Sequence, residues 1–128
     1  MSIEDAGKRA SLEGRNPGVP ESTRNRRVEI AIDFMKVNLH RRIPLAELAQ
    51  AVNLSPSHLS RLFKTQTRLT PGEYLRRLRM EMARQFLETS LMSMKEIMAL
   101  VGYKSRSHFV RDFKDSFRLP PSEYRKRL

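Results

Sequence analysis

"SPSHLSRLFKTQTRLTPGEY", residues 55–74, returns fifty residues later as "SRSHFVRDFKDSFRLPPSEY", residues 105–124. Eleven of the twenty aligned positions are identical. Each copy begins at a serine and then places its apolar residues at helical spacing, with Arg and Lys between them. The chain therefore contains the same helical unit twice.

Each copy is preceded by a short amphipathic segment and a tight turn. "PLAELAQAV", residues 44–52, ends at Asn53, and "MSMKEIMALV", residues 92–101, ends at Gly102. Asn and Gly tolerate the left-handed backbone that such a turn needs. The alignment shifts from fifty to forty-nine residues before the turn, so Lys104 is a one-residue insertion. A helix, a tight turn and a second helix form the helix-turn-helix pattern, in which the second helix enters the major groove of DNA.

The same periodicity predicts an all-α fold of about seven helices, because no segment alternates as a strand would. Residues 1–22 contain Gly and Pro with few large apolar residues, and we interpret them as a flexible arm or linker remnant. Residues 23–69 would form a first helix-turn-helix subdomain and residues 90–128 a second. "TPGE" at residues 70–73 matches a capping box, which predicts a long central helix over residues 70–89.

The charge balance points to a polyanionic partner. The net charge is +11 and the isoelectric point is about 10.9, with −1 on the first 22 residues and +12 on the rest. Nucleic acid is the leading partner class and an anionic membrane surface the second. The chain has no Cys, no apolar run long enough to span a bilayer and no signal peptide, so we expect a soluble cytoplasmic protein. The basic end, residues 125–128, is expected to be solvated.

Both copies carry a polar face opposite their apolar residues. We expect helices over residues 55–66 and 105–116 to read DNA bases. The first presents Ser57, Ser60, Arg61 and Lys64, and the second presents Arg106, Ser107, Val110, Arg111 and Lys114. Arg can donate two hydrogen bonds to guanine, and Val offers an apolar contact to a thymine methyl group.

From about residue 28 to residue 124 the chain resembles the DNA-binding domain of AraC/XylS-family transcription regulators. "LAELAQAVNLSPSHLSRLFK", "TPGEYLRRLRMEMARQFL", "EIMALVGYKSRSHF" and "RDFKDSFRLPPSEYR" carry the resemblance. It implies two helix-turn-helix subdomains that are joined by a long helix and bind adjacent major-groove segments as a monomer. The base-contacting positions carried over by this resemblance are Ser57, Ser60, Arg61, Arg106, Ser107, Val110 and Arg111. RNA polymerase is a further partner to which the sequence assigns no surface.

A second set of side chains is expected at phosphates. It comprises Ser55, His58, Lys64, Arg68, Lys104, Ser105, His108, Lys114 and Arg118. The expected partner is double-stranded DNA with an asymmetric site of roughly 20 base pairs, since the two reading faces differ.

The chain departs from the family pattern at several positions, among them Met98, where the family usually has Ala, and Lys104, where it often has an acidic or small residue. Arg68 and Arg118 stand where the family usually has Gly in the turn after each reading helix. Either the turn forms without Gly at a local cost, or these arginines reach phosphates. Asp112 stands where Leu62 stands in the first copy, and an unpaired buried carboxylate would be costly. We expect it to be solvated or paired with His108 or Arg118.

Other functions fit less well. The chain lacks cysteine thiolates, a Ser-His-Asp arrangement, a carboxylate pair and a phosphate-cradling Gly loop, so we expect no enzyme activity and no cofactor. His58 and His108 belong to different helices and predict no metal site. Two alternatives stay open, a nonspecific nucleic-acid binder and a detached DNA-binding domain of a larger, effector-responsive regulator.

Overall fold

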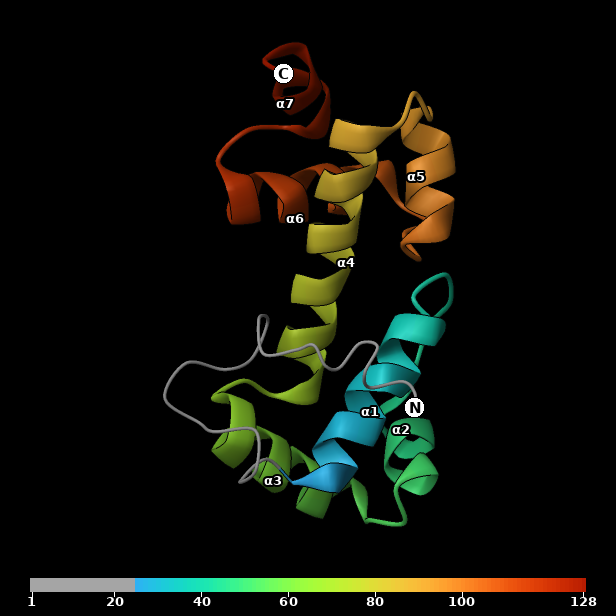
Figure 1. The fold of residues 1–128 in the computed structure, drawn as a ribbon, viewed down its shortest axis with the longest axis vertical. Helices are drawn as coiled ribbons and strands as arrows, with labels where there is room; N and C mark the ends of the chain where they lie inside the picture. The colour runs from blue at the N-terminus through green and yellow to red at the C-terminus, as the bar shows by residue number, and fades with distance from the viewer. Residues whose placement is uncertain (1–24) are drawn as a thin grey trace.

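The computed structural model describes residues 25–128, which form seven α-helices and no strand (Figure 1). They are α1 (Arg26–Val37), α2 (Leu45–Ala51), α3 (Pro56–Thr67), α4 (Pro71–Thr89), α5 (Met94–Leu100), α6 (Arg106–Phe117) and α7 (Pro121–Lys126). The predicted all-α fold is therefore confirmed. The arm expected at residues 1–22 lies outside the described residues. No helix within residues 25–128 is both long and apolar enough to cross a membrane.

Side-chain caps fix where the helices begin. The Oγ1 atom of Thr70 accepts a hydrogen bond from the Glu73 amide, and the Glu73 carboxylate accepts one from the Thr70 amide, which is the predicted capping box. Ser93 and Glu96 repeat this arrangement at the start of α5. Each such cap satisfies backbone N–H groups that have no partner inside the helix, and a lost cap typically costs about 1 kcal/mol.

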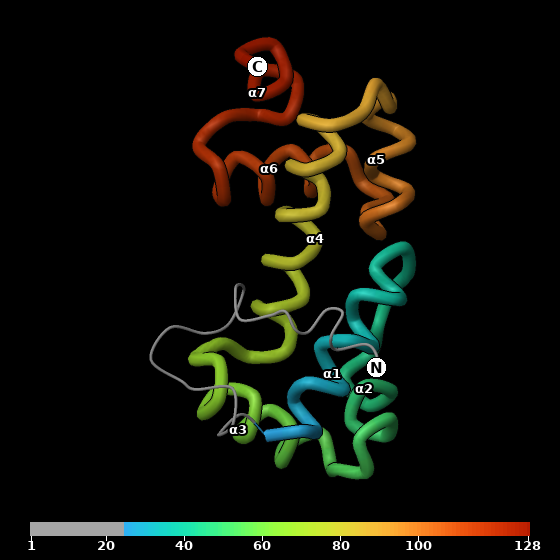
Figure 2. Tube along the Cα trace, viewed as in Figure 1, coloured from blue at the N-terminus to red at the C-terminus, as the bar shows by residue number. Residues whose placement is uncertain are grey.

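Two hydrophobic cores share the long helix α4. The first core is built by α1, α2 and α3, and half-buried Tyr74, Leu75 and Leu78 from the start of α4 pack against it. The second core begins at Met80 and Ala83 on the same helix and continues through α5 and α6. We call these the first and second units. Figure 2 shows α4 running from one unit to the other. Its 19 residues make it about 28 Å long.

The sequence repeat is also a repeat of packing. Tyr74 and Tyr124 occupy equivalent positions in the two copies, and each lies edge-on to the equivalent phenylalanine of α3 or α6. The ring centroids are 5.3 Å apart for Phe63 and Tyr74 and 5.5 Å apart for Phe113 and Tyr124, with interplanar angles of 76° and 78°. Edge-to-face geometry is favoured for aromatic pairs. The same contact therefore anchors the helix that follows α3 and the helix that follows α6.

The basic end of the chain does not behave as a purely solvated terminus, contrary to our expectation. Arg125 in α7 donates hydrogen bonds to the Met92 carbonyl at 2.5 Å and to the Ser90 carbonyl at 3.2 Å, beyond the end of α4. It also reaches the Phe86 carbonyl in the last turn of α4, at 3.4 Å. A cation near a helix C-terminus satisfies carbonyls that lack helical partners. Arg125 is thus a structural cap that ties α7 to α4.

Arg79, near the middle of α4, joins the two units. Its side chain is 8% exposed. Nη1 donates to the Leu39 carbonyl after α1 and to the Val101 carbonyl after α5, the latter at 2.7 Å, while Nη2 donates to the Arg41 carbonyl at 2.9 Å. Burial lowers the pKa of Arg79, but a guanidinium stays protonated in proteins. The relative placement of the units therefore depends on one buried charge held by three carbonyls.

The absence of a side chain at Gly102 makes room for this contact. Gly102 has a φ of +82°, and a Cβ built there would overlap both the Arg79 guanidinium and the Leu39 carbonyl oxygen. A residue with a side chain at this position would meet both a strained backbone and a steric clash. The turn between α5 and α6 thus fits against the first unit because this residue is glycine.

We predict that Arg79→Met lowers the free energy of unfolding by about 2 kcal/mol or more, since three carbonyls, two of them in buried hydrogen bonds, lose a charged donor. Arg77→Met, at an exposed arginine of the same helix, should change it by less than about 0.5 kcal/mol. Urea unfolding measures both. Gly102→Ala should cost less in the Arg79→Met background than alone, and equal costs would show that the two residues are not coupled.

Candidate nucleic-acid interface

The helices expected to read DNA are α3 and α6, each the second helix of its helix-turn-helix. Each begins one residue after a serine cap. Ser55 Oγ accepts from the His58 amide and Ser105 Oγ accepts from the His108 amide, both at 3.2 Å. α3 and α6 cover residues 56–67 and 106–117, so each lies within a residue of its predicted bounds. Both helices therefore begin with the same serine-to-amide hydrogen bond.

The residues predicted to contact bases lie on the outer sides of these helices. Ser57, Arg61, Arg106, Ser107 and Arg111 are exposed, and Ser60 and Val110 are half-buried. The inner sides are closed by Leu59 and Phe63 in α3 and by Phe109 and Phe113 in α6, which are at most 1% exposed. The structure thus gathers each predicted set on one helix, with the two sets in different units. Base contact by these residues stays a prediction.

Five of the residues predicted to contact phosphates are Lys or Arg, and all five are exposed: Lys64, Arg68, Lys104, Lys114 and Arg118. His58, His108 and Ser55 are exposed as well, and Ser105 is half-buried. The caps use the serine oxygens as acceptors and leave the hydroxyl protons for other partners. Nothing in this placement removes a member from the predicted set.

The turns after α3 and α6 form without glycine. Arg68 and Arg118 take the left-handed conformation, with φ of 70° and 74°. Their amides close the helix ends by donating to the Lys64 and Lys114 carbonyls at 2.8 and 2.7 Å. A residue with a Cβ costs roughly 1–2 kcal/mol in this region. The turn therefore forms without Gly, at a local conformational cost, as the first of our two expectations stated. The second expectation, that these arginines contact phosphates, is compatible with this conformation and stays a prediction.

Asp112 is paired, but not with the residues that we expected. Its side chain is 8% exposed, and it accepts a 2.6 Å hydrogen bond from the Tyr103 hydroxyl and a 3.3 Å contact from Arg111 Nε. Within residues 25–128, neither His108 nor Arg118 makes a bond to it. Burial, together with this bond to Asp112, raises the pKa of Tyr103, so the phenol stays a donor. The carboxylate is therefore satisfied inside the second unit.

The sequence held a signal for this pair. Tyr103 aligns with Leu54 at a lag of forty-nine, and Asp112 aligns with Leu62 at a lag of fifty. Leu54 and Leu62 both pack against the first core. An apolar pair in one copy is thus replaced by a hydrogen-bonded polar pair in the other. The replacement of Leu62 by Asp112 does not by itself indicate which residue bonds to the carboxylate, so sequence reasoning did not identify Tyr103 as its partner.

Within residues 25–128, no group of three or more His, Asp or Glu side chains could hold a metal ion. His58 and His108 sit at the starts of different helices in different units, as the sequence indicated. The chemistry that this surface offers is that of exposed arginines, lysines and serines on two helices.

Comparisons with known proteins agree with this geometry. A family model described as a helix-turn-helix domain matches residues 48–127. The chain is similar to the lactose operon transcription activator of Staphylococcus xylosus, with 36% identity over 80 residues, which cover 62% of this chain and 29% of that protein. The chain thus spans less than a third of the curated relatives that it matches first.

Solved structures give the same picture of the fold. A transcriptional regulator with an AraC-type DNA-binding domain from Chromobacterium violaceum superimposes with a TM-score of 0.74 and 29% identity, covering 79% of this chain and 90% of that one. The DNA-binding domain of the transcriptional factor AdpA, solved in complex with a target DNA, also gives a TM-score of 0.74. It is 24% identical and covers 77% of this chain and 89% of that one. This second likeness concerns the fold alone.

We predict that Tyr103→Phe lowers the free energy of unfolding by about 1–3 kcal/mol, because a buried carboxylate loses its main donor. The double variant Tyr103→Leu with Asp112→Leu, which copies the first unit, should recover most of this loss. Thermal unfolding measures both. Tyr124→Phe is the matched control, since the Tyr124 hydroxyl bonds to Glu88 near the surface, and its loss should be smaller. A double variant less stable than Tyr103→Phe would contradict the prediction.

Proposed function

The chain belongs to the AraC-type family of helix-turn-helix proteins, and from that membership we propose that it regulates transcription by binding specific sequences of double-stranded DNA. In this proposal α3 and α6 read two successive major-groove segments. The observation that carries it is the pair of equally capped helices, each with an apolar side in its own core and an outer side bearing exposed Ser, Arg and Lys. The AdpA complex supports it at the level of the fold.

The proposed binding mode is that of a monomer on an asymmetric site. One chain already supplies two reading helices, and about 34 Å between them would match one turn of DNA. The two outer faces share Ser, Arg and Lys at equivalent positions but differ where Pro56 is replaced by Arg106 and Ser60 by Val110. We therefore propose a site of roughly 20 base pairs without a palindrome. Contact with RNA polymerase stays a prediction of the family resemblance.

We also propose a domain organisation for the chain. Residues 23–69 and 90–128 are the two DNA-binding subdomains, and residues 70–89 join them. Each subdomain completes its core with one half of α4, which supports treating the helix as part of both. The short overlap with its longer relatives fits a DNA-binding domain that acts together with further domains, so the detached-domain alternative is retained.

Selection of bound sequences from random duplexes tests the function. We expect a defined site that is protected in footprinting over about 20 base pairs and is preferred over random DNA by about 10³-fold or more. Affinity should fall steeply with salt. Recovery of no preferred sequence would favour the nonspecific alternative and contradict the proposal.

Variants of the two central arginines locate the readout. Arg61→Ala and Arg111→Ala should each relax the preference at one base position, at a cost of about 1–3 kcal/mol. Each should affect a different half of the site. Lys36→Ala removes an exposed charge on α1 and should leave every preference unchanged. A uniform loss across all sequences would mean that these arginines contact phosphates only.

Substitutions of Arg68 and Arg118, which have a left-handed backbone, should affect stability and DNA binding in opposite directions. Arg68→Gly and Arg118→Gly are expected to raise the free energy of unfolding by up to about 1 kcal/mol, because glycine relieves the strained φ. Each should also lower the slope of log affinity against log salt by about 0.9, if one phosphate contact is lost. Arg68→Ala keeps the strain, so it should lose affinity without gaining stability. Unchanged salt dependence in all three variants would assign these arginines to the turn alone.

A further inference from the structure

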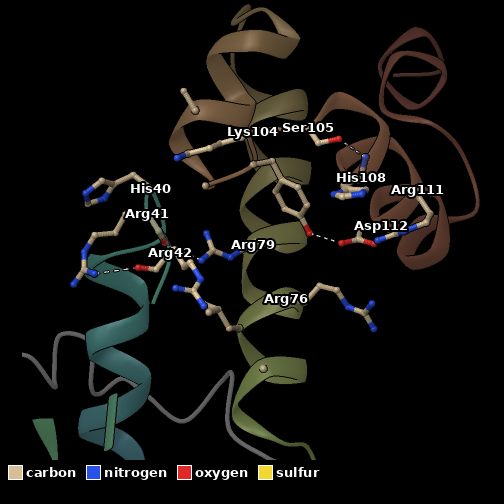
Figure 3. A pocket seen from close by; sticks show the side chains of 15 residues that line it. His40, Arg41, Arg42, Arg76, Arg79, Lys104, Ser105, His108, Arg111 and Asp112 are labelled. Carbon is tan, nitrogen blue, oxygen red and sulfur yellow. Dashed lines mark hydrogen bonds and ion pairs between the residues drawn. The ribbon is translucent and has the colours of Figure 1, made fainter. Parts of the chain in front are cut away.

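A cleft of about 750 Å³ opens between the two units (Figure 3). Its walls are the loop of residues 40–42 after α1, one side of α4, and the turn before α6 together with the first turns of α6. The lining holds six Arg and Lys side chains and one carboxylate, that of Asp112. A cavity with this balance favours an anionic occupant.

Three of these cations are uncommitted. Arg41 is held by Glu47, with Nη2 to Oε2 at 2.6 Å, and Arg79 is held by backbone carbonyls. The Asp112 carboxylate is already bonded to Tyr103. The side chains of Arg42, Arg76 and Lys104 make no hydrogen bond or ion pair anywhere in the part of the chain that the structure describes, and all three are exposed. Each of the three walls therefore carries a cation that makes no hydrogen bond or ion pair, although Arg76 still interacts electrostatically with Glu73.

The cleft adjoins the helix proposed to read DNA. Ser105, His108 and Asp112 line it at three- and four-residue spacing, so they share one flank of α6. Ser107 and Val110 lie on the neighbouring outer side, and Arg111 borders both surfaces. A helix in the major groove has the DNA backbone along its flanks. The flank of α6 that faces the first unit is the one that opens into the cleft.

On the premise of the proposed function, we propose that this cleft holds the DNA backbone between the two recognised segments, with Arg42, Arg76 and Lys104 each facing a phosphate. The three residues lie on the α1–α2 loop, on α4 and before α6, so the charges are spread along the junction between the units. One DNA strand carries a phosphate for about every 3.4 Å of helix axis, which suits a row of separate charges. A single small anion would instead require donors that converge on one point.

Arg79 gives this cleft a fixed shape. It lines the cleft, and its bonds to the Leu39, Arg41 and Val101 carbonyls hold the opposite walls together. A contact that relies on preformed geometry loses little entropy on binding. The cleft would then bind the DNA backbone between the two recognised segments without contacting bases. Because the cleft has a fixed shape, this contact would fix the spacing of the two segments.

The test uses the whole chain and the duplex that it selects. Arg42→Gln, Arg76→Gln and Lys104→Gln should each lower affinity about eightfold at 0.1 M salt, and each should reduce the salt slope by about 0.9. The base preferences found by selection should not change, since phosphate contacts carry no sequence information. Lys36→Gln is the matched control and should bind as the unaltered chain does. Thermal unfolding verifies that these exposed substitutions leave the fold intact.

Neutral methylphosphonates in the DNA locate the contact. Replacing the phosphates between the two segments should weaken binding of the unaltered chain. It should not further weaken binding of a variant that combines Arg42→Gln, Arg76→Gln and Lys104→Gln. If the loss of affinity from the methylphosphonates and the loss from the substitutions were fully additive, the inference would be overturned. It would also be overturned if the variants kept the affinity and the salt slope of the unaltered chain. Tight binding of inorganic phosphate or pyrophosphate to the free chain would overturn it as well, in favour of a small-anion site. If the unaltered chain selects no sequence at all, it is the proposed function that fails.

Discussion

The buried guanidinium of Arg79 holds the first and second units in a fixed placement relative to each other. It bonds to carbonyls that follow α1 and α5, and among residues 25–128 no carboxylate pairs with it, so its desolvation is offset by charge-assisted bonds to the backbone. Backbone acceptors cannot swing away as a side chain can, so the bond fixes directions as well as distances. Two helix-turn-helix units held this way present one combined surface, whereas independently mobile units would pay an extra ordering cost on binding.

The repeat explains why so much of the fold could be predicted. Serine caps, the capping box at Thr70 and the helical spacing of the apolar residues are local signals, and the structure reproduces each of them. Repetition adds a check that one copy lacks, because a pattern seen twice at one spacing seldom arises by accident. The charge and the exposed faces of α3 and α6 follow from the same local rules, so the candidate interface was within reach of sequence reasoning.

What escaped prediction is long-range. The sequence singled out no role for Arg79, and it placed Arg125 in a solvated basic end. The carbonyls that Arg79 bonds are 22 to 40 residues away, and those that Arg125 bonds are 33 to 39 residues away. No periodicity in the sequence reveals contacts at such separations. Asp112 shows the intermediate case. Its partner Tyr103 is only nine residues away, and comparing the copies at both lags exposes the exchange of Leu54 and Leu62 for a polar pair.

The comparison of the copies also bears on specificity. Ser57, Arg61 and Lys64 recur as Ser107, Arg111 and Lys114, while two outer positions change, from Pro56 to Arg106 and from Ser60 to Val110. Equal side chains on equally capped helices should favour a common base step in both halves of the site, most simply a guanine facing each arginine. The change from hydroxyl to isopropyl should favour a thymine methyl in the second half only. The two halves would thus be related but distinguishable, and a backbone contact between them that ignores sequence can fix their spacing without disturbing that distinction.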